Sequence, residues 1–129
     1  MRKFLWLRLL VMSCAIEGRT EFNAGVAAWE RDDYDRAIVE FQSAIRKNDE
    51  LGEAHEGLAE CYVRKQMLAE AQKSYARAKQ LYDDGKFQDT PTDDAKKKLR
   101  VNEQLDWIEK ALALDAKTPA STTDRKSVV

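Results

Sequence analysis

The sequence predicts an all-α fold in which antiparallel helix pairs are stacked in series, and two observations support this prediction. Only two prolines and five glycines occur among 129 residues, while alanine, leucine, glutamate and lysine are abundant, as is typical of helical proteins. A pattern of small and aromatic residues also returns once with a period of about 34 residues, the length of a two-helix repeat. Its members Ala37, Phe41 and Ala44 return as Ala71, Tyr75 and Ala78.

The first predicted helix covers residues 19–31. Its apolar residues are distributed around the whole circumference, so we expect it to be buried on more than one side. These residues are Phe22, Ala24, Gly25, Ala28 and Trp29. Asp32 and Asp33 are expected to form the following turn, because aspartate tolerates unusual backbone angles and caps helices well.

Three more helices are predicted at residues 34–47, 52–65 and 68–82. The first of them has the i, i+4, i+7 spacing of one buried face. This face consists of Ala37, Ile38, Phe41, Ala44 and Ile45. Gly85 follows two aspartates and is a good signal for the end of the last of these helices.

A fifth helix is predicted at residues 93–116, after a loop, with Thr92 as its N-cap and acidic residues in its first turn. Its apolar stripe consists of Val101, Leu105, Ile108 and Leu112. We interpret it as a single long capping helix, because the end of a stack of repeats needs cover. The polar, patternless residues 117–129 are expected to be disordered.

The repeat resembles the tetratricopeptide repeat family, whose pattern is W-x2-L-G-x2-Y, then A-x3-F, then P. The first unit, residues 18–51, matches it with Gly25, Ala28, Ala37 and Phe41, and the second, residues 52–85, with Leu58, Ala59, Tyr62, Ala71 and Tyr75. Both units lack the first tryptophan. They also lack the closing proline, in whose place Asp49 and Asp83 stand. The resemblance implies a right-handed α-α superhelix over residues 16–85, with loop and cap in 86–116, and a role in protein–protein interaction.

The composition and the motifs argue against several classes of function. There are 22 basic and 23 acidic residues, with a net charge of −1, whereas a strong non-specific nucleic-acid binder would be basic. One histidine, His55, cannot form a metal cluster of the usual spacing, and phosphate-binding or nucleophile motifs are absent from the sequence. We therefore expect no enzyme and no cofactor. His55 is expected to pack between helices, with a pH-sensitive contact as the alternative, and Cys61 to be a small buried residue.

In the family, the first helix of each pair lines a concave groove. The candidate peptide-binding residues are therefore Phe22, Asn23, Val26, Trp29, Glu53, Glu56 and Glu60. The three glutamates share one helical face, so we expect a groove with one apolar and one acidic wall. Such a groove suits a peptide that carries Lys or Arg beside an apolar anchor. The alternative is that the glutamates form a solvated face and the aromatic residues pack against the N-terminal or the fifth helix.

The chaperone-tail class of this family holds a terminal carboxylate with Lys and Asn at the groove. Only Asn23 matches that surface here, so we reject this class of ligand. A second hypothesis is a self-associating structural subunit of an envelope or multiprotein assembly, because two repeats are fewer than a stable stack usually needs. The protein would then be a homo-oligomer rather than an adaptor.

Residues 1–15 follow the plan of a secretory signal: a basic start, an apolar run and small residues around Cys14. A cut after Ala15, or lipidation of Cys14, would export the chain or attach it to a membrane. Arg8 argues against export, because arginine within an apolar helix costs about 2.5–3.5 kcal/mol on insertion. The alternative is an N-terminal helix that packs on the domain. We favour export to a bacterial envelope, periplasmic or lipid-anchored, over the cytoplasm.

Overall fold

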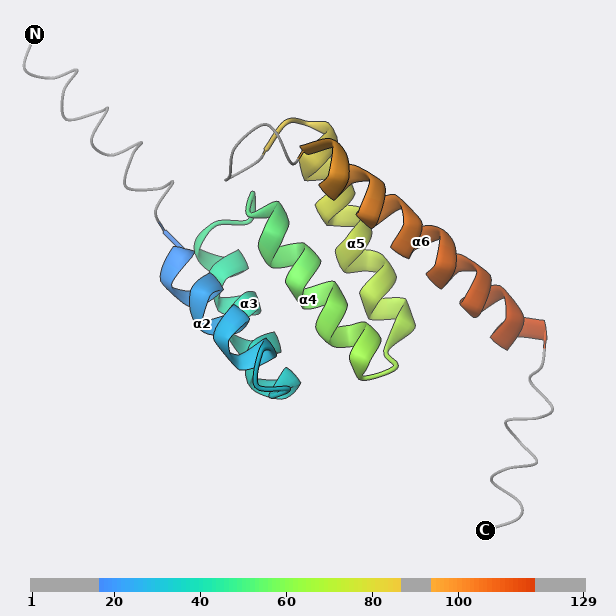
Figure 1. Cartoon of the computed structure of the whole chain (residues 1–129), viewed down its shortest axis with the longest axis horizontal. Helices are drawn as coiled ribbons and strands as arrows, with labels where there is room; N and C mark the ends of the chain where they lie inside the picture. Colours follow the sequence, from blue (N-terminus) through green and yellow to red (C-terminus); the bar gives the residue numbers. More distant parts are fainter. Residues whose placement is uncertain (1–16, 87–93, 118–129) are drawn as a thin grey trace, which may run out of the picture.

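The computed structural model describes residues 17–86 and 94–117 (Figure 1). Within these ranges there are five helices and no strands. They are α2 (Arg19–Trp29), α3 (Tyr34–Lys47), α4 (Gly52–Arg64), α5 (Leu68–Asp83) and α6 (Asp94–Lys117). The all-α prediction is confirmed, and each predicted helix agrees with the structure to within two residues at either end.

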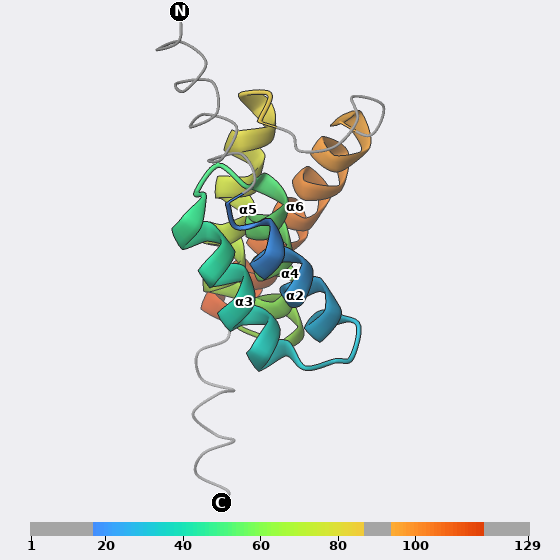
Figure 2. The ribbon, with the colours of Figure 1, turned by 90° about the vertical axis from the view of Figure 1, so that its left-hand side faces the viewer.

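The helices form two antiparallel pairs followed by α6. Helix α2 packs on α3, α4 packs on α5, and contacts of α3 with α4 and of α5 with α6 join the elements in series. Figure 2 shows α3 on one side of the stack and α2 on the other, with α6 on the side of α2. The right-handed superhelix stays a prediction.

The two turns within the pairs have the same backbone conformation despite different sequences. Asp32 and Gln66 occupy equivalent positions of the two units, and both have positive φ, 59° and 61°. In each turn the next amide reaches back to the first helix: the N–H of Asp33 donates to the carbonyl of Ala28, and that of Met67 to the carbonyl of Tyr62. Each turn thus has a residue other than glycine in the left-handed region, and such residues are uncommon in proteins.

The small residues of the repeat pattern allow the helices to pack close together. The side chains of Ala37, Ala59 and Ala71 are completely buried. A Cβ atom on Gly25 would lie 2.7 Å from Cδ1 of Phe41, and one on Gly57 would lie 2.7 Å from Cζ of the same ring. The Phe41 ring is therefore seated between glycines of its own pair and of the next pair.

Helix α6 covers the second pair. Val101 and Ile108 have no exposed surface and pack in one cluster with Tyr75 and Tyr82 of α5. The opposite side of α6 is unlike a solvated cap, because it carries three exposed apolar side chains. Leu99 is 60% exposed, Trp107 50% and Leu114 65%.

Several predictions concern residues outside those that the structure describes. These are the signal segment at 1–15 with Cys14, the N-cap Thr92 and the tail beyond residue 117. Lys117, which was predicted to begin the tail, is instead the last residue of α6. A search of the described helices found none that is long and apolar enough to cross a membrane.

Candidate functional site

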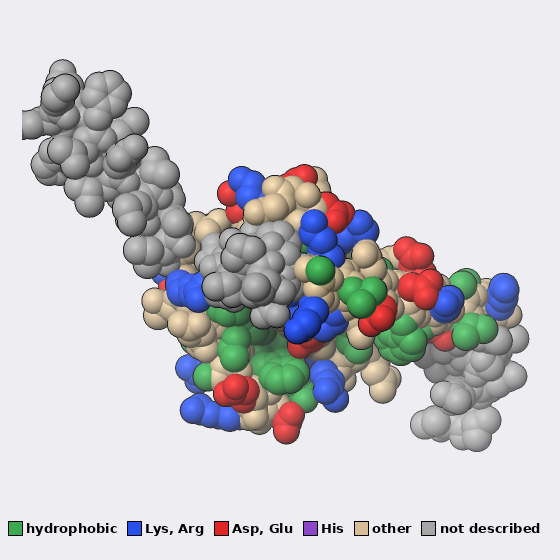
Figure 3. Space-filling view, turned by 45° about the horizontal axis from the view of Figure 1, so that its top comes forward, with side chains coloured by type: hydrophobic (Ala, Val, Ile, Leu, Met, Phe, Trp, Pro, Cys, Tyr) green, Lys and Arg blue, Asp and Glu red, His purple; other side chains and the backbone are tan. Residues whose placement is uncertain are grey.

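A hollow of about 270 Å³ opens on the face of the molecule formed by α2, α4 and α6. Figure 3 shows a patch of hydrophobic side chains on this side, bordered by acidic and basic ones. Six of the seven residues predicted for the groove line the hollow: Phe22, Val26, Trp29, Glu53, Glu56 and Glu60. The first helices therefore bring these six residues to one surface, and their role in binding stays a prediction.

The apolar wall comes from α2 and from one ring of α3. The ring centroids of Phe22 and Phe41 lie 5.8 Å apart, with the rings tilted by 47°. Gly57 of α4 also lines the hollow, where it has no side chain to cover the Phe41 ring. The indole Nε1 of Trp29 is buried and has no hydrogen-bond partner among the described residues, an arrangement that is unusual in a folded core.

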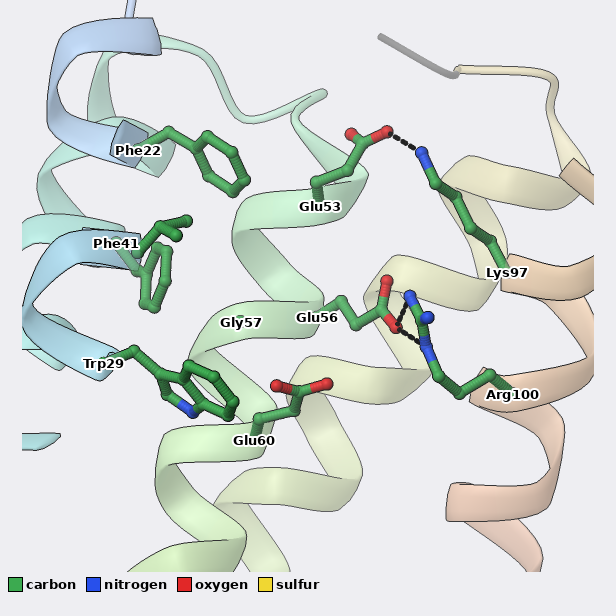
Figure 4. Close-up of a pocket in the computed structure, with 10 residues that line it drawn as sticks. Phe22, Trp29, Phe41, Glu53, Glu56, Gly57, Glu60, Lys97 and Arg100 are labelled. Atoms are coloured by element: carbon green, nitrogen blue, oxygen red, sulfur yellow. Dashed lines mark hydrogen bonds and ion pairs between the residues drawn. The ribbon is translucent and has the colours of Figure 1, made fainter. Parts of the chain in front are cut away.

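The wall that the three glutamates were expected to make acidic is largely neutralised by basic residues of α6. Nζ of Lys97 lies 3.0 Å from Oε1 of Glu53. Arg100 donates from Nε to Oε1 of Glu56 at 2.6 Å, and the Tyr82 hydroxyl donates to Oε2 of Glu56 at 2.7 Å. Figure 4 shows both basic side chains reaching from α6 to the glutamates of α4.

Glu56 is a structural residue as well as a lining residue, because it is only 5% exposed. Its hydrogen bond with Arg100 raises the pKa of the guanidinium. Burial, followed by the Glu56 charge, raises the pKa of the Tyr82 hydroxyl, so this hydroxyl stays protonated and acts as a donor. Replacing Glu56 by lysine is therefore expected to destabilise the fold as well as to change the groove.

Glu60 is the carboxylate that keeps the predicted character. Among the described residues it accepts no hydrogen bond and forms no salt bridge. Burial raises the pKa of its carboxyl above the ordinary value, and the neighbouring Glu56 charge raises it further. Glu60 is therefore a partly desolvated acid beside an aromatic wall.

Asn23 is the predicted groove residue that the structure does not bring to the site. Its side chain is exposed and does not line the hollow. It occupies the position equivalent to Gly57, which faces Phe41 of the preceding pair. Because α2 is the first described helix, no preceding pair lies within the described residues to cover Asn23.

The groove continues beyond the first hollow into a second one of about 530 Å³. Trp29, Glu60 and Arg100 line both hollows, and Gln104 adds a residue from the next turn of α6. The sequence analysis missed Lys97, Arg100 and Gln104, since it treated α6 only as a cap. Two basic residues three positions apart on α6, with the same spacing as Glu53 and Glu56 on α4, are the signal that could have found Lys97 and Arg100.

The single histidine and the described cysteine are both away from this groove. Cys61 has no exposed surface, and burial raises the pKa of its thiol to about 11. It is thus the small buried residue that was predicted. Nε2 of half-buried His55 donates to the carbonyl of Asp49 at 3.1 Å. Among the described residues, no cluster of three or more His, Cys, Asp or Glu residues could hold a metal ion.

Comparison with known proteins supports the repeat assignment. A family model described as tetratricopeptide repeat matches residues 28–91, from the end of α2 to beyond α5. The comparison with curated proteins found no match. Tetratricopeptide repeats are non-enzymatic scaffolds and generally act as protein–protein interaction modules. The match, the period of the small residues and the paired helices agree, and the chain belongs to the tetratricopeptide repeat family.

Proposed function

We propose that this protein is an interaction module that binds a peptide segment in the groove between α2, α4 and α6. The observation that supports this function is the juxtaposition of an accessible aromatic wall with an unpaired, partly desolvated acid. Phe22 and Trp29 are half-buried, and Glu60 lines both hollows together with Trp29. Aromatic residues of this kind dominate the energetics of protein interfaces.

The pairing of the glutamates changes the ligand that the groove should prefer. Glu53 and Glu56 are already matched by Lys97 and Arg100, so they offer little to additional positive charges. Glu60 remains for one Lys or Arg side chain of the peptide. The preferred segment therefore has one cation beside an apolar anchor, rather than a run of basic residues.

The test is the affinity of a fluorescein-labelled peptide in which one lysine lies beside leucine and phenylalanine. We expect Trp29→Ala to weaken binding by at least about tenfold, equivalent to roughly 1.4 kcal/mol. Trp107→Ala is the matched control, since Trp107 is 50% exposed and lines neither hollow. Equal losses in the two variants, or no loss in either, would show that the groove is not the binding site.

Self-association is the second candidate, and the exposed side of α6 favours it. Terminal repeats usually carry a polar outer surface, whereas Leu99, Trp107 and Leu114 are exposed here. Two copies could bury these residues against each other. A mass that rises with concentration in light scattering, and returns to the monomer value in Leu99→Glu/Leu114→Glu, supports this candidate. A monomer at every concentration contradicts it.

Export remains a proposal that depends on residues 1–15. Mass spectrometry of the protein from its native host distinguishes a full-length chain, a chain cut after Ala15 and a chain lipidated at Cys14. A full-length, unmodified chain would contradict export by this route.

A further inference from the structure

A third hollow, of about 420 Å³, lies on the other face of the molecule, between α3 and α5 and above α4. Its walls carry Arg46 of α3 and Lys73 and Arg77 of α5, and its floor carries His55 and Leu58 of α4. These are the faces of the second helices, which lie away from the groove described above (Figure 2). The proposed function makes no use of them.

The charge around this hollow is one-sided. Among the described residues that line it there are three cations and no carboxylate. Arg46, Lys73 and Arg77 form no salt bridge with any described residue, and Arg77 donates only to the amide oxygen of Gln80, at 2.9 Å. The whole chain is nearly balanced, with 22 basic and 23 acidic residues.

Several basic residues elsewhere in the described part of the chain have acidic partners. Lys47 pairs with Glu21, Lys79 with Asp83, and Lys110 with Asp106. An unmatched group of three cations around one hollow therefore stands out from the pattern of the chain. Such a group attracts anionic ligands and speeds their association.

The floor and the spacing of the cations favour a peptide over a small anion. Leu58 and Ile45 provide apolar surface within the hollow. Lys73 and Arg77 are one turn apart on α5, a rise of about 6 Å. Alternate side chains of an extended chain point the same way and are separated by about 7 Å. Two acidic side chains of an extended peptide could therefore meet both cations, with an apolar side chain between the helices.

We propose that this hollow binds an acidic peptide segment, in which Asp or Glu side chains contact Arg46, Lys73 and Arg77 and an apolar side chain rests on Leu58 and Ile45. The protein then has two recognition surfaces with opposite preferences, one on each face of the stack. It could hold a basic, apolar segment and an acidic segment at the same time.

The first test measures binding of a fluorescein-labelled peptide in which glutamates alternate with leucines. Arg46→Glu/Lys73→Glu should weaken binding by at least about tenfold, and added salt should weaken it in the parent protein. Both residues are exposed, so their replacement leaves the core intact, which a thermal melt checks. Arg31→Glu/Lys117→Glu makes the same change in net charge at exposed positions away from the hollow and should bind normally.

The second test uses His55, the single histidine of the sequence, as a local reporter in NMR. Burial and the charge of Arg77 lower the pKa of His55, while its bond to the backbone of Asp49 and the Asp49 charge oppose this shift. Because Nε2 donates to Asp49, protonation occurs at Nδ1. Acidic side chains bound near Arg46, Lys73 and Arg77 should raise the pKa of His55. Glu60→Gln, on the other face, should leave this response unchanged.

Three outcomes would overturn the proposal. The acidic peptide could bind equally well to Arg46→Glu/Lys73→Glu and to the parent protein. Saturating peptide could leave the titration of His55 unchanged. Inorganic phosphate could compete with the peptide and shift His55 to the same extent at similar concentrations, which would reduce the hollow to a general anion site.

Discussion

Helices α2 and α4 occupy equivalent positions in the two repeats, yet two of the three equivalent pairs of groove-facing residues combine an apolar side chain with an acid. The equivalent positions hold Phe22 and Glu56, Val26 and Glu60, and Trp29 and Val63. Glu56 is covered by Arg100 and Tyr82, whereas Phe22 keeps an open side. The repeat therefore determines where a side chain lies, while the neighbouring helix determines whether it stabilises the fold or is left to bind a partner.

The largest expected effect comes from removing α6 by ending the chain after Lys86. Val101 and Ile108 are fully buried, and each contributes about 1.5–3 kcal/mol through burial. Their loss uncovers Tyr75 and Tyr82 and leaves Glu56 without Arg100. We expect the fragment to aggregate or to melt without cooperativity, as measured by circular dichroism. A fragment that unfolds cooperatively would show that α4 and α5 are no more dependent on a neighbour than α2 and α3.

The next effect is that of Glu56→Ala, which removes the carboxylate that accepts from the buried Tyr82 hydroxyl. A hydrogen bond to a charged group is worth about 1.5–3 kcal/mol, and the Arg100 side chain, which is 53% exposed, can be solvated instead. We expect the free energy of unfolding to fall by about 2–3 kcal/mol in urea denaturation. Glu60→Ala is the control one turn further along α4 and should change stability by less than about 0.5 kcal/mol. Similar losses in the two variants would contradict the separate roles of the two acids.

Phe22→Ala should be milder for stability and more harmful for binding. The ring is half-buried and its contact with Phe41 at 5.8 Å contributes about 0.5–1.5 kcal/mol beyond burial. We expect a loss of about 1–2 kcal/mol in the free energy of unfolding, and a larger loss in affinity for the lysine-containing peptide. A loss of about 3 kcal/mol or more in stability would identify Phe22 as a core residue rather than a groove residue.

Glu60→Gln should have the smallest effect on stability, and its sign depends on pH. The pKa of the Glu60 carboxyl is raised in the folded protein above its ordinary value of 4.5, so the folded state holds the proton more tightly than the unfolded state. Between the pKa of the unfolded state and the raised pKa of the folded state, the contribution of Glu60 to stability falls as pH rises. Glutamine should remove this contribution and be neutral or slightly stabilising at neutral pH. Melting temperatures measured against pH, for parent and variant, would test it; parallel curves contradict the raised pKa.

Much of the fold could be predicted because the relevant signals are local. The period of small and aromatic residues placed α3 from its first to its last residue, and Asp32 and Asp33 marked the turn before it. Gln66 was harder, since its backbone copies that of Asp32 without any of the usual turn residues. The packing of α4 on α5, which repeats that of α2 on α3, fixes the backbone of this turn instead of its own residue types.

The pairing of two groove glutamates with basic residues of α6 could not be predicted, for a non-local reason. Glu53 and Glu56 lie 44 residues from Lys97 and Arg100 in the sequence. The connection between α5 and α6 has no repeat period, so the register of α6 against α4 could not be derived from the spacing of residues. Glu60 differs from the other two glutamates because neither Lys97 nor Arg100 forms a salt bridge with it, although Arg100 lines the same two hollows.

The seat of Phe41 between Gly25 and Gly57 has a mechanical consequence for the whole stack. The ring is the spacer that sets the distance between the first pair and the second, because the facing helix surfaces carry only hydrogen atoms at those points. A larger residue at Gly57 would tilt one pair against the other and alter the curvature of the array. Residues beneath the groove therefore control its curvature. Changes at these residues are a route by which evolution can adjust the size of partner that the groove accepts.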